Sequence, residues 1–479
     1  MKTKFLMPLI ISMLALSACN SKPSDESKES KDQETESVEV LSKESESISE
    51  SESVEESESE DRNPKRIEKN INIKLNGLYD SSKTYPLDFA FDSDFFFEDA
   101  KVFNKDLAMV SFGLALASAN ETAIKAFHEV FNCEDTKYVN YNVTPSEDTL
   151  AYSIAKVHVN DQNLYMLAVR GFEYGAEWAN NLEVGIVGNH AGFERKAKQV
   201  LADLTDFIGD DDTDYRLWMT GYSRGAAICN VISHFILSEE EPLVKQENMF
   251  VYTFETPRGL AEENEIIYEN VFNIVNHNDL VTHIAPKSYG LSRCGIDIDI
   301  YNENVAELLK AFDSSITLPE FSPQENEFQN DEEFLAYLMN MFNPAEDEEE
   351  DAKDIKTREH YYSNFQPSVM YVVKLVFTLS DSTLAKIMEA IKALEGFQKL
   401  TILSVDGLYN LVKPILDEDG YEYNDEELKT NLNKVATEML PTCTELLLVV
   451  VAEKTDNLIR LINMHYPETV YVLLNNYAE

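Results

Sequence analysis

The stretch Leu217-Trp218-Met219-Thr220-Gly221-Tyr222-Ser223-Arg224-Gly225-Ala226-Ala227 decides the fold of this chain. Residues 215–220 form a short apolar run that predicts a strand, and residues 226–236 have the periodicity of a helix. A Gly-x-Ser-x-Gly pattern therefore lies where a strand turns into a helix. In so tight a turn the residues two before and two after the serine must be small, because larger side chains would collide with the strand and the helix. Gly221 and Gly225 meet this requirement.

This turn makes Ser223 a candidate nucleophile. We expect the serine at the N-terminus of the helix, where its attack is aided and where the N–H of Arg224 can point at a developing oxyanion. Because that donor belongs to the main chain, an arginine side chain there need not spoil it. The alternative interpretation is a glycine-rich turn in which the serine is incidental.

Strands and helices alternate on both sides of the turn, which is typical of an α/β sheet with helices packed on it. Polar and apolar residues alternate in 151–160 and 163–169, and Asn160-Asp161 between them supplies a turn, so a strand pair is expected. Other segments predict helices at 107–119, 190–207 and 262–268, and strands at 250–254 and 271–275. After residue 300 only helical patterns follow, at 305–312, 333–342, 369–379, 383–397 and 428–440.

The chain opens as an export signal is built. Met1-Lys2-Thr3-Lys4 precedes an apolar run at 5–16, which is too short to span a bilayer. The run ends in Leu16-Ser17-Ala18-Cys19, which resembles the lipobox of bacterial lipoproteins, in which Cys19 becomes the lipid-bearing N-terminus. We therefore expect the mature protein on the cell membrane, lipid-anchored and facing the extracytoplasmic side. The alternative is an ordinary secretory peptide with an incidental cysteine.

Composition divides the chain into five parts. After the signal peptide at 1–18, residues 19–62 are rich in Ser, Glu and Lys, and they predict a disordered tether because they offer almost nothing to bury. Residues 63–300 predict the α/β core, 301–454 a largely helical insertion that would cover the site as a cap, and 455–479 a return to the core. The acidic break at 346–354 and the apolar run at 446–452 both fall inside the insertion.

The chain is strongly acidic, with 40 Lys and Arg against 87 Asp and Glu and a formal charge of -47. Such a surface repels phosphate backbones, so nucleic-acid binding is not expected. It also disfavours unaided docking on anionic headgroups, which leaves the lipid on Cys19 as the route to a membrane. Neither metal-ligand clusters nor phosphate-cradling loops appear, so no metal or cofactor is expected. We expect the four other cysteines to be mostly buried thiols, with one disulfide as the alternative: Cys133, Cys229, Cys294 and Cys443.

Four blocks around the Gly-x-Ser-x-Gly turn resemble the class 3 lipases, which are α/β-hydrolases that cleave acylglycerols and related esters. Beyond the turn itself they are, in chain order, Val169-Arg170-Gly171, Glu177-Trp178-Ala179-Asn180-Asn181-Leu182 with His190-Ala191-Gly192-Phe193, Tyr252-Thr253-Phe254-Glu255-Thr256-Pro257-Arg258, and Val275-Asn276-His277-Asn278-Asp279-Leu280-Val281. The resemblance covers roughly residues 107–295. It implies an α/β-hydrolase-like central sheet and an acyl-ester or lipid substrate.

The resemblance also assigns roles to individual residues. It implies that Ser223 is the nucleophile and Asp279 the acid, and that the N–H of Phe172 joins that of Arg224 in an oxyanion hole. The chain departs from the family pattern at two positions: Phe172 replaces the usual Ser or Thr, and Glu255 replaces a usual Gly. Independently, a carboxylate after the strand at 271–275 would lie on the same sheet edge as the serine, where it can orient an imidazole. The alternative role for Asp279 is to cap a turn.

A serine nucleophile needs a base, and eight histidines are available. His465, in Asn463-Met464-His465-Tyr466-Pro467-Glu468-Thr469-Val470-Tyr471, is similar to a late His-x-x-Glu-x-Tyr element of the family, and it completes the chain order Ser, Asp, His. His360 also follows the acid and is the runner-up, and neither is the third option. The other six are expected to be structural or too close in sequence to Asp279 to face it: His128, His158, His190, His234, His277 and His283.

Three functions compete at this point. The first is an extracytoplasmic serine hydrolase that cleaves carboxylic esters through an acyl-enzyme. The second is an amidase, peptidase or thioesterase, since fold and triad do not fix the leaving group. The third is a lipase-like surface lipoprotein without activity, which the departures at Phe172 and Glu255 suggest and the intact Gly-x-Ser-x-Gly turn opposes.

Overall fold

The computed structural model describes residues 41–42, 66–80, 82–146, 148–172, 175–283, 289–325, 327–340, 358–394, 401, 404–439 and 455–478. The predicted signal peptide and Cys19 lie outside these residues, as do the acidic break and the apolar run 446–452. Of the predicted tether only β1 (Leu41–Ser42) is described, and it pairs antiparallel with β2 (Glu68–Asn76). Within the described part, no helix is long and apolar enough to cross a membrane.

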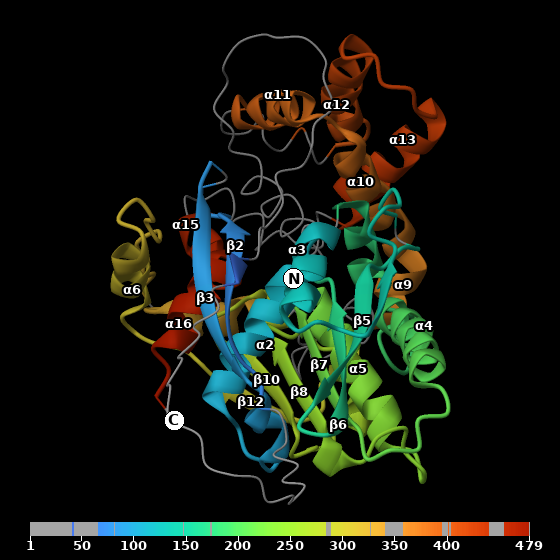
Figure 1. The fold of residues 1–479 in the computed structure, drawn as a ribbon. Coiled ribbons are helices and arrows are strands. Elements are labelled where there is room, and N and C mark those ends of the chain that lie inside the picture. Colours follow the sequence, from blue (N-terminus) through green and yellow to red (C-terminus); the bar gives the residue numbers. More distant parts are fainter. Residues whose placement is uncertain are drawn as a thin grey trace, which may run out of the picture.

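A seven-stranded mixed sheet forms the centre of the protein, in the order β12-β10-β8-β7-β6-β5-β4 (Figure 1). The strands β6, β7, β8, β10 and β12 run parallel, and β5 and β4 add antiparallel at one edge. Their bounds are β4 (Asp135–Val139), β5 (Tyr152–Val159), β6 (Gln162–Val169), β7 (Arg216–Tyr222), β8 (Met249–Phe254), β10 (Val271–Val275) and β12 (Ile296–Asp299). The central strands β8 and β10 are buried at every residue, as expected for parallel strands covered on both faces.

The predicted β5–β6 pair is confirmed, and its turn explains why these residues stand there. Asn160 and Asp161 both have positive φ, 46° and 63°. Such angles favour Asn, Asp and Gly, and two in succession match the right-handed twist of the hairpin.

Each face of the sheet is covered by its own helices and core. The helices α4 (Ala191–Ile208) and α5 (Arg224–Leu237) pack on one face. On the other face lie α2 (Lys105–Ala117), α3 (Glu121–Val130) and the hairpin of β2 with β3 (Thr84–Asp92). Figure 1 shows the blue and cyan elements and the green helices on opposite sides of the strands. This layering confirms the predicted α/β-hydrolase-like fold class.

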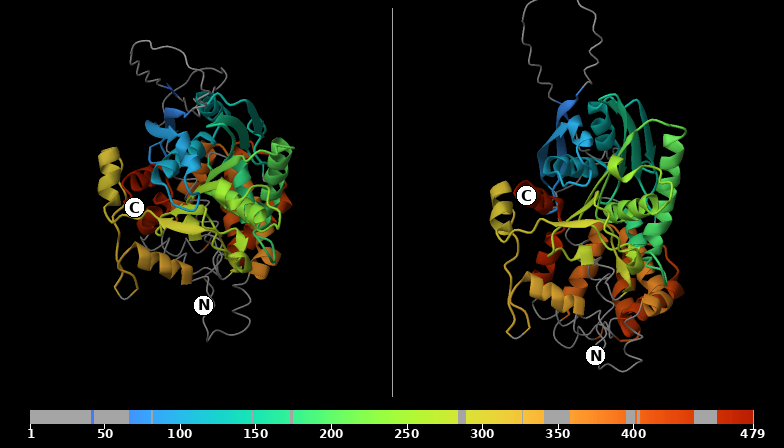
Figure 2. Two further views of the ribbon diagram at one scale, coloured as in Figure 1. Left: turned by 60° about the horizontal axis from the view of Figure 1, so that its bottom comes forward. Right: turned by 90° about the horizontal axis from the view of Figure 1, so that it is seen from below.

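Helices also dominate the expected insertion, 301–454. They are α6 (Val305–Phe312), α7 (Asp331–Asn340), α9 (Arg358–Asn364), α10 (Gln366–Thr378), α11 (Asp381–Lys392), α12 (Gly407–Glu418), α13 (Asp425–Asn433) and the π-helical turn η8 (Lys434–Met439). Residues of α7, α9 to α13 and η8 share one apolar cluster, which we call the cap cluster. In contrast, α6 packs against α16 (Pro467–Asn475) in the main core, and the two lie side by side in both Figure 1 and Figure 2.

Two local expectations differ from the structure. The predicted helix at 262–268 is wrong: only the three-residue 3₁₀ turn η4 (Glu262–Asn264) forms. The carbonyl of Ile266 instead accepts the N–H of Gly295 at 2.9 Å and that of Tyr268 at 3.1 Å, so tertiary contacts satisfy this backbone. The strands β2, β3 and β12 were not expected from the sequence. The thiols of Cys133, Cys229 and Cys294 are free, whereas Cys443 lies outside the described residues.

Candidate active site

Ser223 lies on a tight backbone turn in which the flanking positions have room only for glycine. A Cβ on Gly221 would lie 2.4 Å from the carbonyl carbon of Gly225, and a Cβ on Gly225 would lie 2.2 Å from the carbonyl oxygen of Val169. Ser223 itself has φ 52° and ψ -121°, a backbone conformation that residues other than glycine rarely adopt. The turn is therefore held in a strained form by its neighbours, and it lifts the serine to the start of α5.

Asp279 follows β10 on the same edge of the sheet. Its N–H donates to the carbonyl of Asn276 at 2.8 Å, and its Oδ1 accepts the N–H of Val281 at 2.8 Å. The hydroxyl of Thr282 donates to its backbone carbonyl at 2.9 Å. The carboxylate thus caps the short turn η5 (Val281–His283) with one oxygen and keeps the other free for a second partner. The turn-capping contact considered for this residue in the sequence is present.

His465 lies in the turn between α15 (Thr455–Asn463) and α16, where Pro467 fixes the start of the second helix. The hydroxyl of Tyr222 donates a hydrogen bond to its backbone carbonyl. One turn later, Glu468 Oε1 accepts the N–H groups of Leu78 at 2.6 Å and Tyr79 at 3.2 Å. The hairpin and the residue next to Ser223 therefore fix the histidine-bearing turn from two sides.

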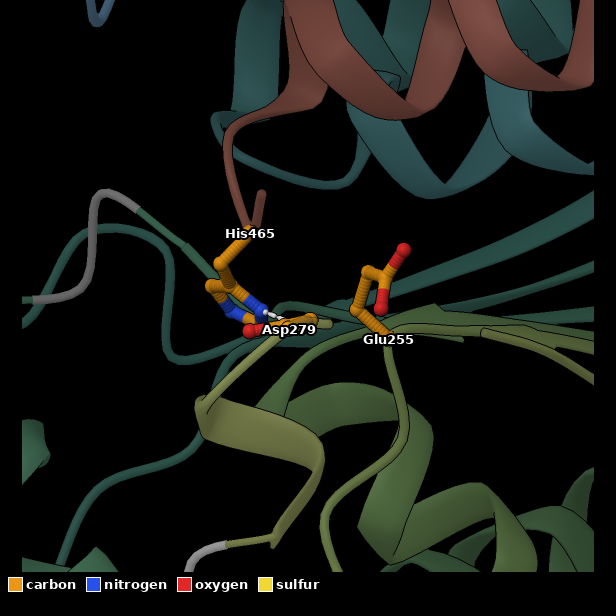
Figure 3. Close-up of side chains that lie close together, drawn as sticks. All are labelled: Glu255, Asp279 and His465. Carbon is orange, nitrogen blue, oxygen red and sulfur yellow. Dashed lines mark hydrogen bonds and ion pairs between the residues drawn. The ribbon is translucent and has the colours of Figure 1, made fainter. Parts of the chain in front are cut away.

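The structure brings these three side chains into one hydrogen-bonded row. His465 Nε2 lies 2.8 Å from Ser223 Oγ. His465 Nδ1 lies 2.5 Å from Asp279 Oδ2, and Figure 3 shows this second contact. The hydroxyl of Ser223 makes no capping bond to its own helix, so it is available to the imidazole. When Nδ1–H donates to the carboxylate, the imidazole is in the tautomer whose Nε2 can accept the serine proton. Ser223 is 7% exposed and Asp279 is fully buried, whereas the His465 side chain is 15% exposed, so water reaches only the imidazole to any extent.

Backbone packing also brings the end of β6 against the turn. A Cβ on Gly171 would lie 1.4 Å from the carbonyl oxygen of Tyr222, so no other residue fits there. This contact carries the following residue, Phe172, to the serine turn, where its ring packs edge-on against Tyr222 with centroids 5.8 Å apart. The main-chain N–H groups of Phe172 and Arg224 thus belong to two segments that meet at Ser223.

The side chain of Arg224 is buried in an ion network beneath the turn. Its Nη1 lies 2.7 Å from Glu177 Oε2, and both side chains are 0% exposed. Arg170 pairs with the other oxygen of the same carboxylate. Arg224 Nη2 further donates to the carbonyl of Thr149 at 3.2 Å and to Asn180 Oδ1 at 3.3 Å. The side chain of Arg224 therefore stabilises the fold from the interior. Its main-chain N–H remains at the start of α5.

Glu255 is the least expected member of the site. It follows β8 with φ 48°, is 0% exposed, and lies beside Asp279 and His465 (Figure 3). Its Oε2 accepts the N–H of Asn276 at 3.2 Å. Burial, and then the negative charge of Asp279, raise the pKa of Glu255 well above its ordinary value.

These three residues also form a group in which each offers one ligand atom within 4.8 Å of the others. A metal ion is not a natural occupant, because a hydrogen bond of 2.5 Å already joins Asp279 to His465 and the second nitrogen of His465 is held by Ser223. An ion with ligands at about 2.0–2.2 Å would have to break both contacts.

The remaining histidines have other partners. His360 Nδ1 lies 3.2 Å from the Asn364 amide in α9, so the runner-up is not the imidazole placed on Ser223. His190 stacks on Phe193 with centroids 3.9 Å apart and caps α4, and burial lowers its pKa to about 3. Burial likewise lowers the pKa of His128 to about 3 and that of His283 to about 4. His277 pairs with Asp299 at 2.7 Å, and this hydrogen bond raises its pKa.

A surface hollow of about 590 Å³ lies away from this site. Its lining includes Asn163 and Tyr165 at the start of β6, whereas Val169 at the other end of β6 pairs with Gly221 beside the nucleophile. The hollow therefore has no part in the chemistry at Ser223.

Sequence reasoning missed three supporting residues: Tyr222, Glu177 and Glu468. Glu177 and Glu468 both stood inside quoted motifs, and their place in those motifs was the available signal. The role of Tyr222 had no signal, since its hydroxyl reaches a residue 243 positions away.

Comparison with known proteins gives one family. The sequence model of the class 3 lipases matches residues 166–289, which hold the second half of β6, the Ser223 turn and Asp279. No curated protein matches the chain. Similar solved structures include a triacylglycerol lipase whose catalytic centre is described as a serine protease triad, 18% identical over 42% of this chain and 83% of that one, with a TM-score of 0.32.

Two fungal lipases are similar at the same level. The lipase from Rhizopus microsporus var. chinensis is 18% identical over 40% of this chain and 72% of its own, with a TM-score of 0.31. Lipase II from Rhizopus niveus is 19% identical over 39% of this chain and 77% of its own, with a TM-score of 0.29. At these TM-scores the role of each residue rests on the geometry above. Residues 166–289 therefore match the class 3 lipases, the family that the sequence resemblance named.

Proposed function

We propose that this protein is a serine hydrolase that cleaves carboxylic esters of lipids with Ser223, His465 and Asp279 as its triad. The observation that carries the proposal is the hydrogen-bonded row of 2.8 Å and 2.5 Å from Ser223 Oγ through the imidazole to Asp279 Oδ2. Three polar groups from distant parts of the chain share this row, and the serine keeps a strained φ of 52°. Such strain persists where the surrounding structure enforces it, which is typical of functional sites.

The reaction follows from the roles of these groups. Ser223 Oγ attacks the ester carbonyl carbon while His465 Nε2 takes its proton, and Asp279 stabilises the imidazolium that forms. The N–H groups of Phe172 and Arg224 stabilise the negative charge on the carbonyl oxygen. His465 then gives its proton to the leaving alcohol, and the acyl group stays on the serine. Water, activated by the same imidazole, attacks the acyl-enzyme and releases the acid.

The cap cluster supports a lipid substrate. Leu280 and Tyr466, the neighbours of Asp279 and His465, belong to the same apolar cluster as the helices of the cap. A shift of these helices would therefore expose apolar side chains beside the triad, where an acyl chain can bind. With Ser223 7% exposed, we infer that the cap moves as a lid when substrate arrives.

A fluorophosphonate probe tests the triad. We expect labelling of the wild type, none of Ser223→Ala, and strongly reduced labelling of His465→Ala, with His360→Ala as the matched histidine control that still reacts. Absence of labelling of the wild type would favour an inactive lipase-like protein instead.

A substrate panel tests the bond that is cleaved. We expect acyl esters of graded chain length to turn over faster than matched amides and thioesters. Preference for amides or thioesters would replace the ester hydrolase with an amidase or thioesterase on the same residues.

We further propose that a lipid on Cys19 anchors the enzyme outside the cytoplasm. The supporting observation is Leu16-Ser17-Ala18-Cys19 at the end of an apolar run. Metabolic labelling with a fatty-acid analogue should mark the wild type in the membrane fraction and leave Cys19→Ser unmarked. Equal membrane retention of both would contradict the anchor.

A further inference from the structure

We propose that Glu255 is protonated at neutral pH and donates a hydrogen bond to Asp279. The acid of the triad is then a pair of carboxyls that share one proton. Glu255 is then a positioning residue, because it acts on the ester through Asp279. The proposal rests on the proposed hydrolase function, since it concerns the acid of the same triad.

The contacts of Glu255 leave one hydrogen bond missing. Its Oε2 accepts the N–H of Asn276 at 3.2 Å, whereas its Oε1 is buried and has no hydrogen-bond partner among the described residues. One ligand oxygen of Glu255 lies within 4.8 Å of an oxygen of Asp279 and a nitrogen of His465. Two ionised carboxylates can only accept, so they cannot satisfy each other. A proton on one of them would let that carboxyl donate a hydrogen bond to the other, and a hydrogen bond with Asp279 is among the causes that raise the pKa of Glu255.

The surroundings decide which carboxyl carries the proton. Both oxygens of Asp279 already accept a hydrogen bond, one from the N–H of Val281 and the other from a ring nitrogen of His465. Glu255 has a single backbone donor. Burial and the charge of Asp279 raise the pKa of Glu255 well above its ordinary value, which agrees with this assignment.

The other charged and titratable groups around Glu255 do not reverse it. Arg293, which follows β11 (Leu291–Ser292), lowers the pKa of Glu255, but this is the last of its causes. The guanidinium is engaged with Asp297 at 2.6 Å and with the carbonyl of Thr256 at 2.8 Å. From β7, Tyr222 has a pKa raised by burial and directs its hydroxyl to the carbonyl of His465. Within this shell the neutral acid is therefore Glu255.

The backbone shows that the side chain is kept at a conformational cost. Glu255 has φ 48°, in the left-handed region where glycine fits without strain. Its N–H donates to the carbonyl of Ile274 at 2.9 Å, and the carbonyl of Phe254 just before it accepts the N–H of Ser223 at 2.8 Å. The geometry that holds the nucleophile thus fixes Glu255 beside the acid. A glycine at this position would relieve the backbone strain, but it has no side chain that could donate a hydrogen bond to Asp279.

Ionisation of Glu255 at alkaline pH would remove the donated hydrogen bond and place two negative charges side by side. Repulsion would then move Asp279 away from His465, and turnover would fall. Glutamine keeps an N–H donor and cannot ionise, whereas glycine has neither property.

Kinetics of Glu255→Gln and Glu255→Gly test this, with Glu194→Gln as the control, because Glu194 is a partly exposed glutamate of α4 that pairs with Lys198. We expect Glu255→Gly to lower kcat about tenfold with KM unchanged and Gln to restore most of this loss, as for a hydrogen bond to a charged group. The wild type and Glu194→Gln should lose activity at alkaline pH, and Glu255→Gln should not. Equal alkaline loss in Glu255→Gln, or full activity of Glu255→Gly, would overturn the proposal.

Infrared spectra of protein with isotope-labelled glutamate give a readout that does not depend on activity. At neutral pH we expect a protonated-carboxyl band that persists in Ser223→Ala and in Glu194→Gln, and that weakens in Glu255→Gln. A band unchanged by Glu255→Gln would overturn the shared proton even if the fluorophosphonate labels Ser223. If the band depends on Glu255 but the fluorophosphonate does not label the protein, the proposed hydrolase function is wrong and the shared proton of the carboxyl pair still holds.

Discussion

Two buried charged clusters flank Ser223, and they are built in opposite ways. On one side, Glu177 lies between Arg170 and Arg224, with contacts to both guanidinium groups. On the other side, Glu255 lies beside Asp279, with two carboxyls and one imidazole within 4.8 Å. The first cluster combines opposite charges, and the second brings like charges together.

This difference separates charged groups that stabilise the fold from charged groups that take part in the reaction. In the arginine cluster, every ionised group has an opposite charge within bonding distance, so protonation changes would only weaken it. In the carboxyl cluster, the like charges force one group to hold a proton, which makes it sensitive to pH. The nucleophile is therefore positioned by a cluster of opposite charges and oriented, through His465, by a cluster that holds two carboxyls side by side.

The largest expected effect comes from breaking the opposite-charge cluster. Glu177→Gln keeps the shape of the side chain but leaves two buried guanidinium groups without their anion. We expect a loss of about 3–5 kcal/mol in the free energy of unfolding, the range for removal of one partner of a buried ion pair. Denaturant unfolding measures it. A loss below about 1 kcal/mol would mean that the cluster behaves like an exposed pair.

A smaller effect is expected from the carboxyl cluster, and it should depend on pH. The ordinary pKa of a Glu is 4.5, and that of folded Glu255 is raised well above it. Between these values the folded protein keeps a proton that the unfolded chain has released, so stability falls as pH rises, by at most about 1.4 kcal/mol per pH unit. Below the ordinary pKa both states hold the proton and this loss is absent.

Glu255→Gln should remove that slope. The free energy of unfolding of Glu255→Gln, relative to the wild type, should therefore increase with pH over the interval above about 4.5. Urea unfolding at several pH values checks this. Parallel curves for the two proteins would show that Glu255 is ionised in the folded state.

The next effect links the two clusters through the nucleophile turn. Tyr222→Phe removes the hydroxyl that donates to the backbone carbonyl of His465 and leaves the ring packing intact. Because the imidazole would be held less firmly, we expect kcat to fall roughly fivefold, equivalent to about 1 kcal/mol, the usual net value of one hydrogen bond. Steady-state kinetics should show KM unchanged. A rise in KM alone would assign Tyr222 to substrate binding.

Much of this site was predictable because it depends on local rules. A tight strand-to-helix turn demands Gly221 and Gly225, and the close approaches at both positions bear this out. The alternation of strands and helices likewise predicted the central sheet. The sequence reasoning preferred His465 over His360, but only the fold brings it 2.8 Å from Ser223 across 242 residues.

The unpredicted parts depend on tertiary contacts. The predicted helix at 262–268 competes with backbone bonds to Gly295, which is remote in sequence. The strand β12 is short and half exposed, so its pattern is weak. In contrast, β3 alternates buried and exposed residues clearly and could have been found. The departure at Glu255 was visible in the sequence, but its meaning required Asp279 to lie beside it.

The smallest expected effect tests whether burial, and not the type of ion pair, distinguishes the arginine cluster. Arg195 on α4 pairs with Glu183 and Asp148 as Arg224 pairs with Glu177, but its side chain is 42% exposed. Water and salt screen such charges, and holding a long side chain in place opposes the attraction. We therefore expect Arg195→Ala to change the free energy of unfolding by less than about 1 kcal/mol, and less still at high salt. A loss as large as that of Glu177→Gln would contradict this view, because stability would then follow the number of ion pairs whether or not they are buried.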